Sequence, residues 1–100
     1  MNFLFNAIVG CRTVSLNMAS SGLLAQVPAI PADIEFYTLE TAECLRACFE
    51  RQNCHVVVFM DSSNICKLFL NVGLTNLTLQ DEQWSQLYTI KCIGKMDIKR

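Results

Sequence analysis

Six cysteines constrain this chain more than any other feature, because an even number of cysteines in 100 residues is typical of a domain held together by disulfides. They lie near both ends and in the middle of the chain: Cys11, Cys44, Cys48, Cys54, Cys66 and Cys92. Cys44 and Cys48 are four residues apart in a segment with helical character, so they project from one face. Cys54 and Cys66 bracket a predicted hairpin. A helix, a hairpin and both ends of the chain could therefore each be held by a disulfide.

Composition and charge limit the class of protein. Hydrophobic residues make up 52% of the chain and charged residues 17%, which predicts one folded domain over residues 1–100 rather than disorder. Eight basic side chains nearly balance nine acidic ones. No strongly positive surface is therefore expected that could bind nucleic acid or an anionic membrane, and we expect neither partner.

The N-terminal segment is a poor signal peptide. Its apolar run, Phe3 to Val9, is short, no basic residue precedes it, and Arg12 interrupts the segment after it. The run is also too short to span a membrane, so we expect no membrane insertion. Cleavage after Ala25 or Ala29 would remove Cys11 and leave an odd number of cysteines. We therefore keep Cys11 in the folded domain, and secretion then requires an export signal supplied in another way.

Hydrophobic periodicity predicts the secondary structure. An opening strand is expected at Ala7–Val9, with a second at Val14–Leu16, so the first terminal strands lie near residues 7–16. Met18–Ala32 contains Ser, Gly and Pro and predicts an irregular loop. A short strand is expected at Ile34–Leu39. A final strand is expected at Leu87–Ile93, after a mixed polar segment.

The middle of the chain, residues 41–70, predicts a helix followed by a hairpin. The helix is expected to start with Thr41 as its N-cap and to end near Arg51. His55–Met60 and Ile65–Leu70 are β-branched and aromatic runs on either side of a four-residue turn cluster. Continuous apolarity in the first run predicts a central strand covered on both faces, by the helix on one face and by the N-terminal loop or a partner on the other.

The predicted helix has one apolar and one charged face. Cys44, Leu45, Cys48 and Phe49 fall on one stripe, as in a helix that packs on a sheet. The remaining face carries both signs of charge and is expected to be a solvated surface, or else part of a contact patch: Glu43, Arg46, Glu50 and Arg51.

The segment from Thr41 to Phe69 resembles the PAN/apple domain family, in particular the divergent, nematode-like PAN domains. The resemblance lies in a helix with two cysteines four apart (Thr41–Cys48), a third cysteine, Cys54, entering a strand with Phe59 and Asp61, and a fourth in the returning strand (Cys66–Phe69). Cys11 and Cys92 extend the resemblance over nearly the whole chain. The segment between Cys11 and Cys44 is longer and more apolar than the family pattern.

The resemblance implies a structure and a role. The implied disulfides are Cys44–Cys66, Cys48–Cys54 and Cys11–Cys92. The implied fold is α+β, with a single helix packed on a twisted antiparallel sheet of four or five strands, in one domain with its core at residues 41–70 and terminal strands near 7–16 and 87–93. The implied function is non-catalytic extracellular recognition of a protein or carbohydrate, without a cofactor.

Two other classes of function compete with recognition. The first is a structural or assembly domain that packs against itself or its neighbours, and the high apolar content favours such self-association slightly. The second is a secreted protease inhibitor, for which no suitable exposed loop is evident in the sequence.

Possible chemical sites have simpler interpretations. A zinc site from Cys44, Cys48, Cys54 and His55 lacks the second close ligand pair that such sites have. His55 and Cys54 are neighbours on a strand and point to opposite faces, so a thiol–imidazole pair is not expected. The acidic pairs Glu40/Glu43 and Asp81/Glu82 lie on polar segments with no apolar pocket to raise a pKa. We expect no catalytic and no metal site.

Two residues before the final strand are further candidates. Asn76, in the triplet Asn76-Leu77-Thr78, is an acceptor sequence for N-glycosylation in a secreted protein. Trp84 is expected to cover the edge of the sheet, with ligand stacking as the alternative.

Overall fold

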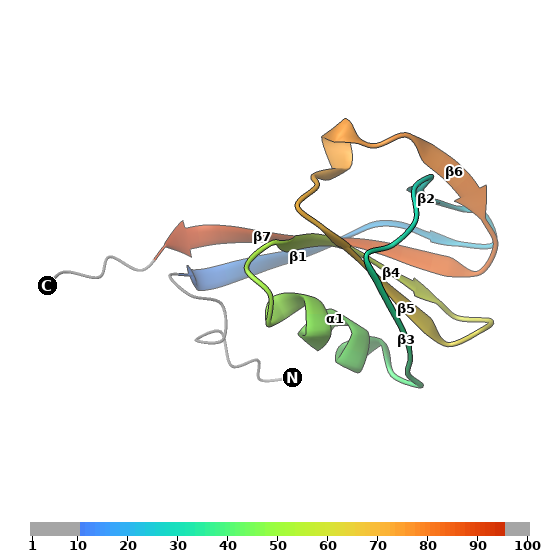
Figure 1. The fold of residues 1–100 in the computed structure, drawn as a ribbon, viewed down its shortest axis with the longest axis horizontal. Helices are drawn as coiled ribbons and strands as arrows, with labels where there is room; N and C mark the ends of the chain where they lie inside the picture. Colours follow the sequence, from blue (N-terminus) through green and yellow to red (C-terminus); the bar gives the residue numbers. More distant parts are fainter. Residues whose placement is uncertain (1–10, 96–100) are drawn as a thin grey trace, which may run out of the picture.

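The computed structural model describes the backbone of residues 11–95 and, within that range, the side chains of 15–75 and 77–91. Its main layer is an antiparallel sheet of five strands in the order β1-β7-β4-β5-β3 (Figure 1). The bounds are β1 Cys11–Gly22, β3 Ile34–Tyr37, β4 Cys54–Met60, β5 Ile65–Leu70 and β7 Ser85–Lys95.

The two faces of this sheet are covered by different elements. Helix α1, Thr41–Phe49, packs mainly over β4 and β5 on one face. On the other face lies a small sheet of two antiparallel strands, β2 (Ala25–Pro28) and β6 (Leu79–Glu82), together with the short helix η2 (Leu74–Asn76) that precedes β6 in Figure 1. The predicted class is confirmed: the chain has an α+β fold in which one α-helix, α1, packs on an antiparallel sheet.

The predicted central hairpin is confirmed. Strand β4 pairs with both β7 and β5, and the β4–β5 turn covers residues 61–64. Asn64 has a φ of 57° there, in the left-handed region that Asn tolerates better than most residues. The backbone N–H of Asn64 donates to the carbonyl of Met60 at 2.8 Å, and the carbonyl of Asn64 accepts from Thr38 N–H at 2.9 Å. The turn therefore also holds the end of β3.

The side chains of β4 alternate between two hydrophobic clusters. Val57 and Phe59 pack toward α1, in a cluster with Leu45, Leu68 and Ile90. The other cluster fills the space between the large sheet and the small one, and its buried members are Ala25, Val27, Val56, Val58, Phe69 and Leu87. Because both faces of β4 are buried, its sequence is continuously apolar, as expected for a central strand.

The irregular loop predicted for Met18–Ala32 is wrong. Strand β1 continues to Gly22, and Ala25–Pro28 forms β2. The small polar residues Ser20, Ser21 and Gly22 indicated a loop, but pairing of β1 with β7 supplies the backbone hydrogen bonds that override these weak preferences. The second face of β4 is therefore covered by strand β2 together with η2 and the connections next to it, and not by one irregular loop.

Other boundaries also differ from the prediction. Helix α1 has Glu40 as its N-cap, with no side-chain capping hydrogen bond, so Thr41 is its first residue and not its cap. The helix ends at Phe49, two residues before Arg51. The polar segment before the final strand contains β6, and the final strand, β7, is longer than expected. The strand expected at Ala7–Val9 lies outside the described residues.

Candidate functional site

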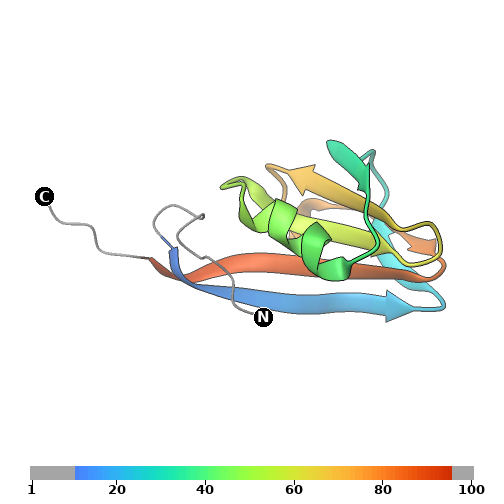
Figure 2. The same ribbon diagram turned by 90° about the horizontal axis from the view of Figure 1, so that it is seen from below.

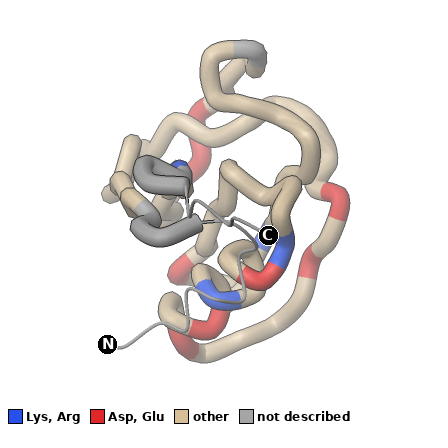
Figure 3. Tube along the Cα trace, turned by 90° about the vertical axis from the view of Figure 1, so that its left-hand side faces the viewer, with Lys and Arg blue, Asp and Glu red and all other residues tan. Residues whose placement is uncertain are grey.

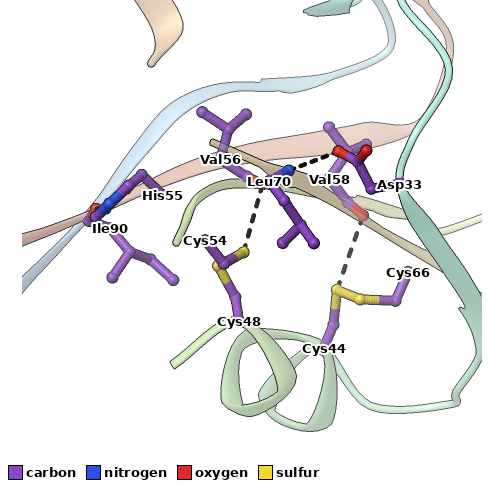
Figure 4. The surroundings of a disulfide bond; sticks show 10 residues. All are labelled: Asp33, Cys44, Cys48, Cys54, His55, Val56, Val58, Cys66, Leu70 and Ile90. Carbon is purple, nitrogen blue, oxygen red and sulfur yellow. Dashed lines mark hydrogen bonds between the residues drawn. A yellow bond between two sulfur atoms is a disulfide. The ribbon is translucent and has the colours of Figure 1, made fainter. Parts of the chain in front are cut away.

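Two disulfides fasten α1 to the sheet (Figure 4). Cys44 is bonded to Cys66 on β5, with a Cα–Cα distance of 5.4 Å, and Cys48 is bonded to Cys54 on β4, with a Cα–Cα distance of 5.2 Å. All four residues are at most 2% exposed. These are the two central pairs implied by the family resemblance, and they use the face of α1 that the apolar stripe indicated.

A β-bulge lets Cys54 reach the helix. Cys54 lies opposite Leu70 and Val56 lies opposite Phe69, so two residues of β4, Cys54 and His55, face one residue of β5. In a regular strand Cys54 would share a face with Val56, which packs in the cluster away from α1. The bulge turns Cys54 into the helix-side cluster, where it bonds to Cys48. No sequence signal marks this bulge.

His55 is the second residue of the bulge. Its side chain is exposed, and Nδ1 lies 3.1 Å from the carbonyl oxygen of Ile90 on β7. A carbonyl oxygen only accepts hydrogen bonds, so Nδ1 carries the proton and donates it.

The sulfurs of Cys44, Cys48 and Cys54 are bonded to other sulfurs and are not available as thiolates for zinc or for a nucleophile.

The charged groups of the described chain lie on its surface. Acidic and basic residues are interspersed along the trace (Figure 3), and Glu43, Arg46, Glu50 and Arg51 are exposed on or just after α1. Glu40 is exposed as well, and the exposed Asp81 accepts a hydrogen bond from the amide of Gln26 on β2. Among the described residues no group of three or more His, Cys, Asp or Glu is arranged to hold a metal ion. Within the same part of the chain, no helix is both long and apolar enough to cross a membrane.

An exposed apolar surface lies where the two sheets join. The chain passes from β1 to β2 through Leu23 and Leu24, and from β6 to β7 through Trp84. These connections are adjacent, because Gly22 pairs with Ser85 and Ala25 pairs with Glu82. Leu23 and Leu24 are each 58% exposed, and Trp84 is 52% exposed. We call these three residues the apolar tip.

The backbone holds the apolar tip in place. The N–H of Trp84 donates to the carbonyl of Leu23 at 3.3 Å, and the carbonyl of Trp84 accepts from the N–H of Asp61 at 2.9 Å. Trp84 has a φ of 53°, a conformation that bulky residues rarely adopt. Gly22, at the start of the opposite connection, has a φ of 109°, which only glycine adopts readily. Strained residues of this kind persist where the surrounding structure fixes them, and they cluster at functional sites.

Sequence reasoning singled out Trp84 but missed its neighbours. Packing against the edge of the sheet was expected for Trp84, with ligand stacking as the alternative, and about half of the residue is accessible to a ligand. Leu23 and Leu24 were not singled out, because they lie within Met18–Ala32, the segment expected to be an irregular loop. Their exposure follows from the pairing of β2 with β6, which forces the chain to turn at these residues.

A polar network lies beside the tip on the helix-side face. The amide nitrogen of Gln86 donates to both carboxylate oxygens of Asp61, at 3.0 and 3.1 Å, and the Tyr88 hydroxyl donates to the amide oxygen of Gln86. Burial raises the pKa of Tyr88 above its ordinary value, and the nearby Asp61 carboxylate raises that pKa further. The network links the β4–β5 turn to β7.

Comparison with known proteins identifies the family. The model of the PAN domain matches residues 25–92, more than half of the chain. The comparisons with curated proteins and with solved structures gave no match. The match includes α1, the central hairpin and both described disulfides, the arrangement typical of extracellular PAN domains. The chain therefore belongs to the PAN domain family, whose members are non-catalytic modules that bind proteins or carbohydrates.

Proposed function

We propose that this PAN domain is an extracellular recognition module that binds a partner protein through the apolar tip. The observation that supports the proposal is the exposure of Leu23, Leu24 and Trp84, each more than half accessible, at one end of a disulfide-braced sheet. Scattered surface apolar residues are normal, but a group of them at one site marks an interaction surface. Tryptophan is also among the residues that most often dominate binding energy at protein interfaces.

The composition of the tip favours protein over carbohydrate. Two aliphatic side chains beside one indole offer apolar contact area but few hydrogen-bonding groups. A sugar site would need several fixed polar groups available to the ring, whereas the polar groups beside the tip, Asp61, Gln86 and Tyr88, are hydrogen-bonded to one another. The hydrogen bonds of Trp84 are made by its backbone, and they fix the tip before contact. A rigid tip loses little conformational entropy on binding, so more of the contact energy contributes to affinity.

An array of extracellular proteins and glycans tests this proposal. The unmodified domain is screened first, and each partner found is then tested with Trp84→Asn, which suits the left-handed backbone at that position. Leu23→Ser is a second tip variant. Tyr37→Ser is the matched control, because Tyr37 is 66% exposed but lies on β3 at the other edge of the sheet.

The expected result is a protein partner whose affinity falls at least about tenfold in both tip variants and stays unchanged in the control. Binding should also be lost after full reduction and alkylation, because the position of the tip depends on a fold that the disulfides stabilise. Binding unaffected by Trp84→Asn and Leu23→Ser would contradict the proposed site. A partner set consisting of glycans alone would contradict the proposed class of ligand.

Three further features are part of the same proposal. We propose that the domain spans residues 1–100, that the Asn76 side chain is glycosylated on secretion, and that Cys11 and Cys92 form a third disulfide. Asn76 ends η2, in the connection between β5 and β6. Peptide mapping of the unreduced secreted protein by mass spectrometry checks the glycan and the disulfide together.

The third disulfide would join two neighbouring strands, but it requires an irregular register between them. Cys11 and Cys92 lie on the neighbouring strands β1 and β7. Cys92 is opposite Val14 and Cys11 is opposite Lys95, with register irregularities between Cys11 and Val14. Because a disulfide needs Cα atoms within about 7 Å, the bridge requires the strands to depart from a regular ladder at this end.

A further inference from the structure

Strand β1 is a long edge strand with little protection against pairing. It is 12 residues long, and among the described residues it pairs only with β7, at the edge of the sheet (Figure 2). The N–H and C=O groups that point away from β7 therefore have no neighbouring strand in the described part of the chain. Natural sheets usually protect such edges with charged residues, proline or short strands. From Thr13 to Gly22 the strand has no charged residue and no proline. The opposite edge strand, β3, has four residues and carries Glu35.

Two apolar side chains of β1, Leu16 and Met18, are partly exposed at this edge of the sheet. Leu16 lies opposite Ile90 and Met18 lies opposite Tyr88, so both share the helix-side face with these buried residues. Helix α1 packs mainly over β4 and β5, further along the sheet. Leu16 is consequently 40% exposed and Met18 51% exposed. Within the described part of the chain, the outer backbone groups of β1 and the side chains of Leu16 and Met18 therefore lack a full set of partners.

The regular part of β1 is complementary to a second copy of itself. The register with β7 is irregular between Cys11 and Val14 and between Met18 and Ser20, but it is regular from Val14 to Met18. A two-fold axis at Leu16 would pair this stretch with its own copy in antiparallel orientation, as an isologous interface requires. Leu16 would then lie opposite Leu16 of the second copy, and Asn17 opposite Ser15. No like charges would meet.

We propose that β1 pairs with β1 of a second copy of this chain about a two-fold axis at Leu16, which joins two five-stranded sheets into one. The second copy is favoured over another extended segment because the stretch is uncharged and matches itself in apolar and polar positions. The two apolar tips would lie at opposite ends of the joined sheet, since the strands are antiparallel and each tip follows the Gly22 end of β1. On the proposed function of the apolar tip, the dimer would therefore present two binding sites, one at each end, and each could hold its own partner.

Reciprocal charge substitution at Leu16 tests the two-fold axis. Sedimentation equilibrium of the full chain is measured from about 10 μM to about 1 mM, the range that suits small transient interfaces. The mass of the unmodified chain should rise from 11.3 kDa toward twice that value. Leu16→Lys and Leu16→Glu should each weaken dimerisation at least tenfold, because like charges would meet at the axis. An equimolar mixture of the two variants should restore the dimer.

The control and a second readout separate this interface from others. Leu39→Lys adds the same charge at a residue that is 70% exposed and lies between β3 and α1, so it should leave dimerisation unchanged. Amide hydrogen exchange should slow with concentration at residues 14–18. A chain that stays monomeric at 1 mM would overturn the proposal. Dimerisation that Leu16→Lys leaves intact, or that the mixture fails to restore, would overturn it as well.

Discussion

Removal of either central disulfide tests how the fold is stabilised. The Cys44–Cys66 bond closes a loop with a sequence separation of 22, and the Cys48–Cys54 bond one with a separation of 6. In the chain-entropy model these closures are worth about 3.4 and about 2.2 kcal/mol. Each pair is replaced by alanine at both positions, so that no free thiol remains. All four cysteines are at most 2% exposed, so the loss of packing is similar in the two double variants.

We expect the free energy of unfolding to fall by about 1 kcal/mol more for Cys44→Ala/Cys66→Ala than for Cys48→Ala/Cys54→Ala, because its loop is longer. For a domain of this size, a loss of about 3 kcal/mol corresponds to a Tm lower by roughly 15–25 °C. Urea denaturation checks the order, once mass spectrometry has confirmed that the remaining cysteines are oxidised. Equal losses, or a larger loss for the Cys48/Cys54 variant, would refute the entropic reasoning. That result would show that the β4 bulge depends on its disulfide.

Contacts on the sheet support three other predictions. The raised pKa of Tyr88 means that its neutral form is favoured in the folded state, so its contribution to stability is present below pH 10 and lost as the pH rises through the folded-state pKa. Unfolding free energies measured between pH 8 and 12 should therefore fall more steeply in the unmodified domain than in Tyr88→Phe, and parallel curves would contradict this. The Asp33 carboxylate accepts a hydrogen bond from Leu70 N–H at 2.7 Å, so Asp33→Ala should lower the unfolding free energy by about 1 kcal/mol and Asp33→Asn by less; no loss in urea denaturation would show that water replaces the bond. His55→Ala should leave binding to any partner unchanged within about twofold in an equilibrium titration, because His55 contacts the carbonyl of Ile90 away from the apolar tip; a larger loss would place the binding surface on β4.

The centre of this protein could be predicted from its amino-acid sequence. Cysteines four apart on an apolar helical stripe, followed by two β-branched runs around a polar turn, were enough to predict α1, the β4–β5 hairpin and the face of the helix that is buried. These features are local, because each depends on residues within one element or one turn. The PAN resemblance rests on the same local pattern.

The remaining features depend on contacts between distant parts of the chain. Strand β2 and the end of β1 look like loop in the sequence, and they become strands because β6 and β7, more than fifty residues away in the chain, supply their hydrogen bonds. The bulge that turns Cys54 toward Cys48 depends on register with β5. The exposure of Leu23, Leu24 and Trp84 likewise depends on how two sheets meet, since hydrophobicity alone would place all three in a core. Sheet pairing is non-local, so periodicity along the chain carries little information about it.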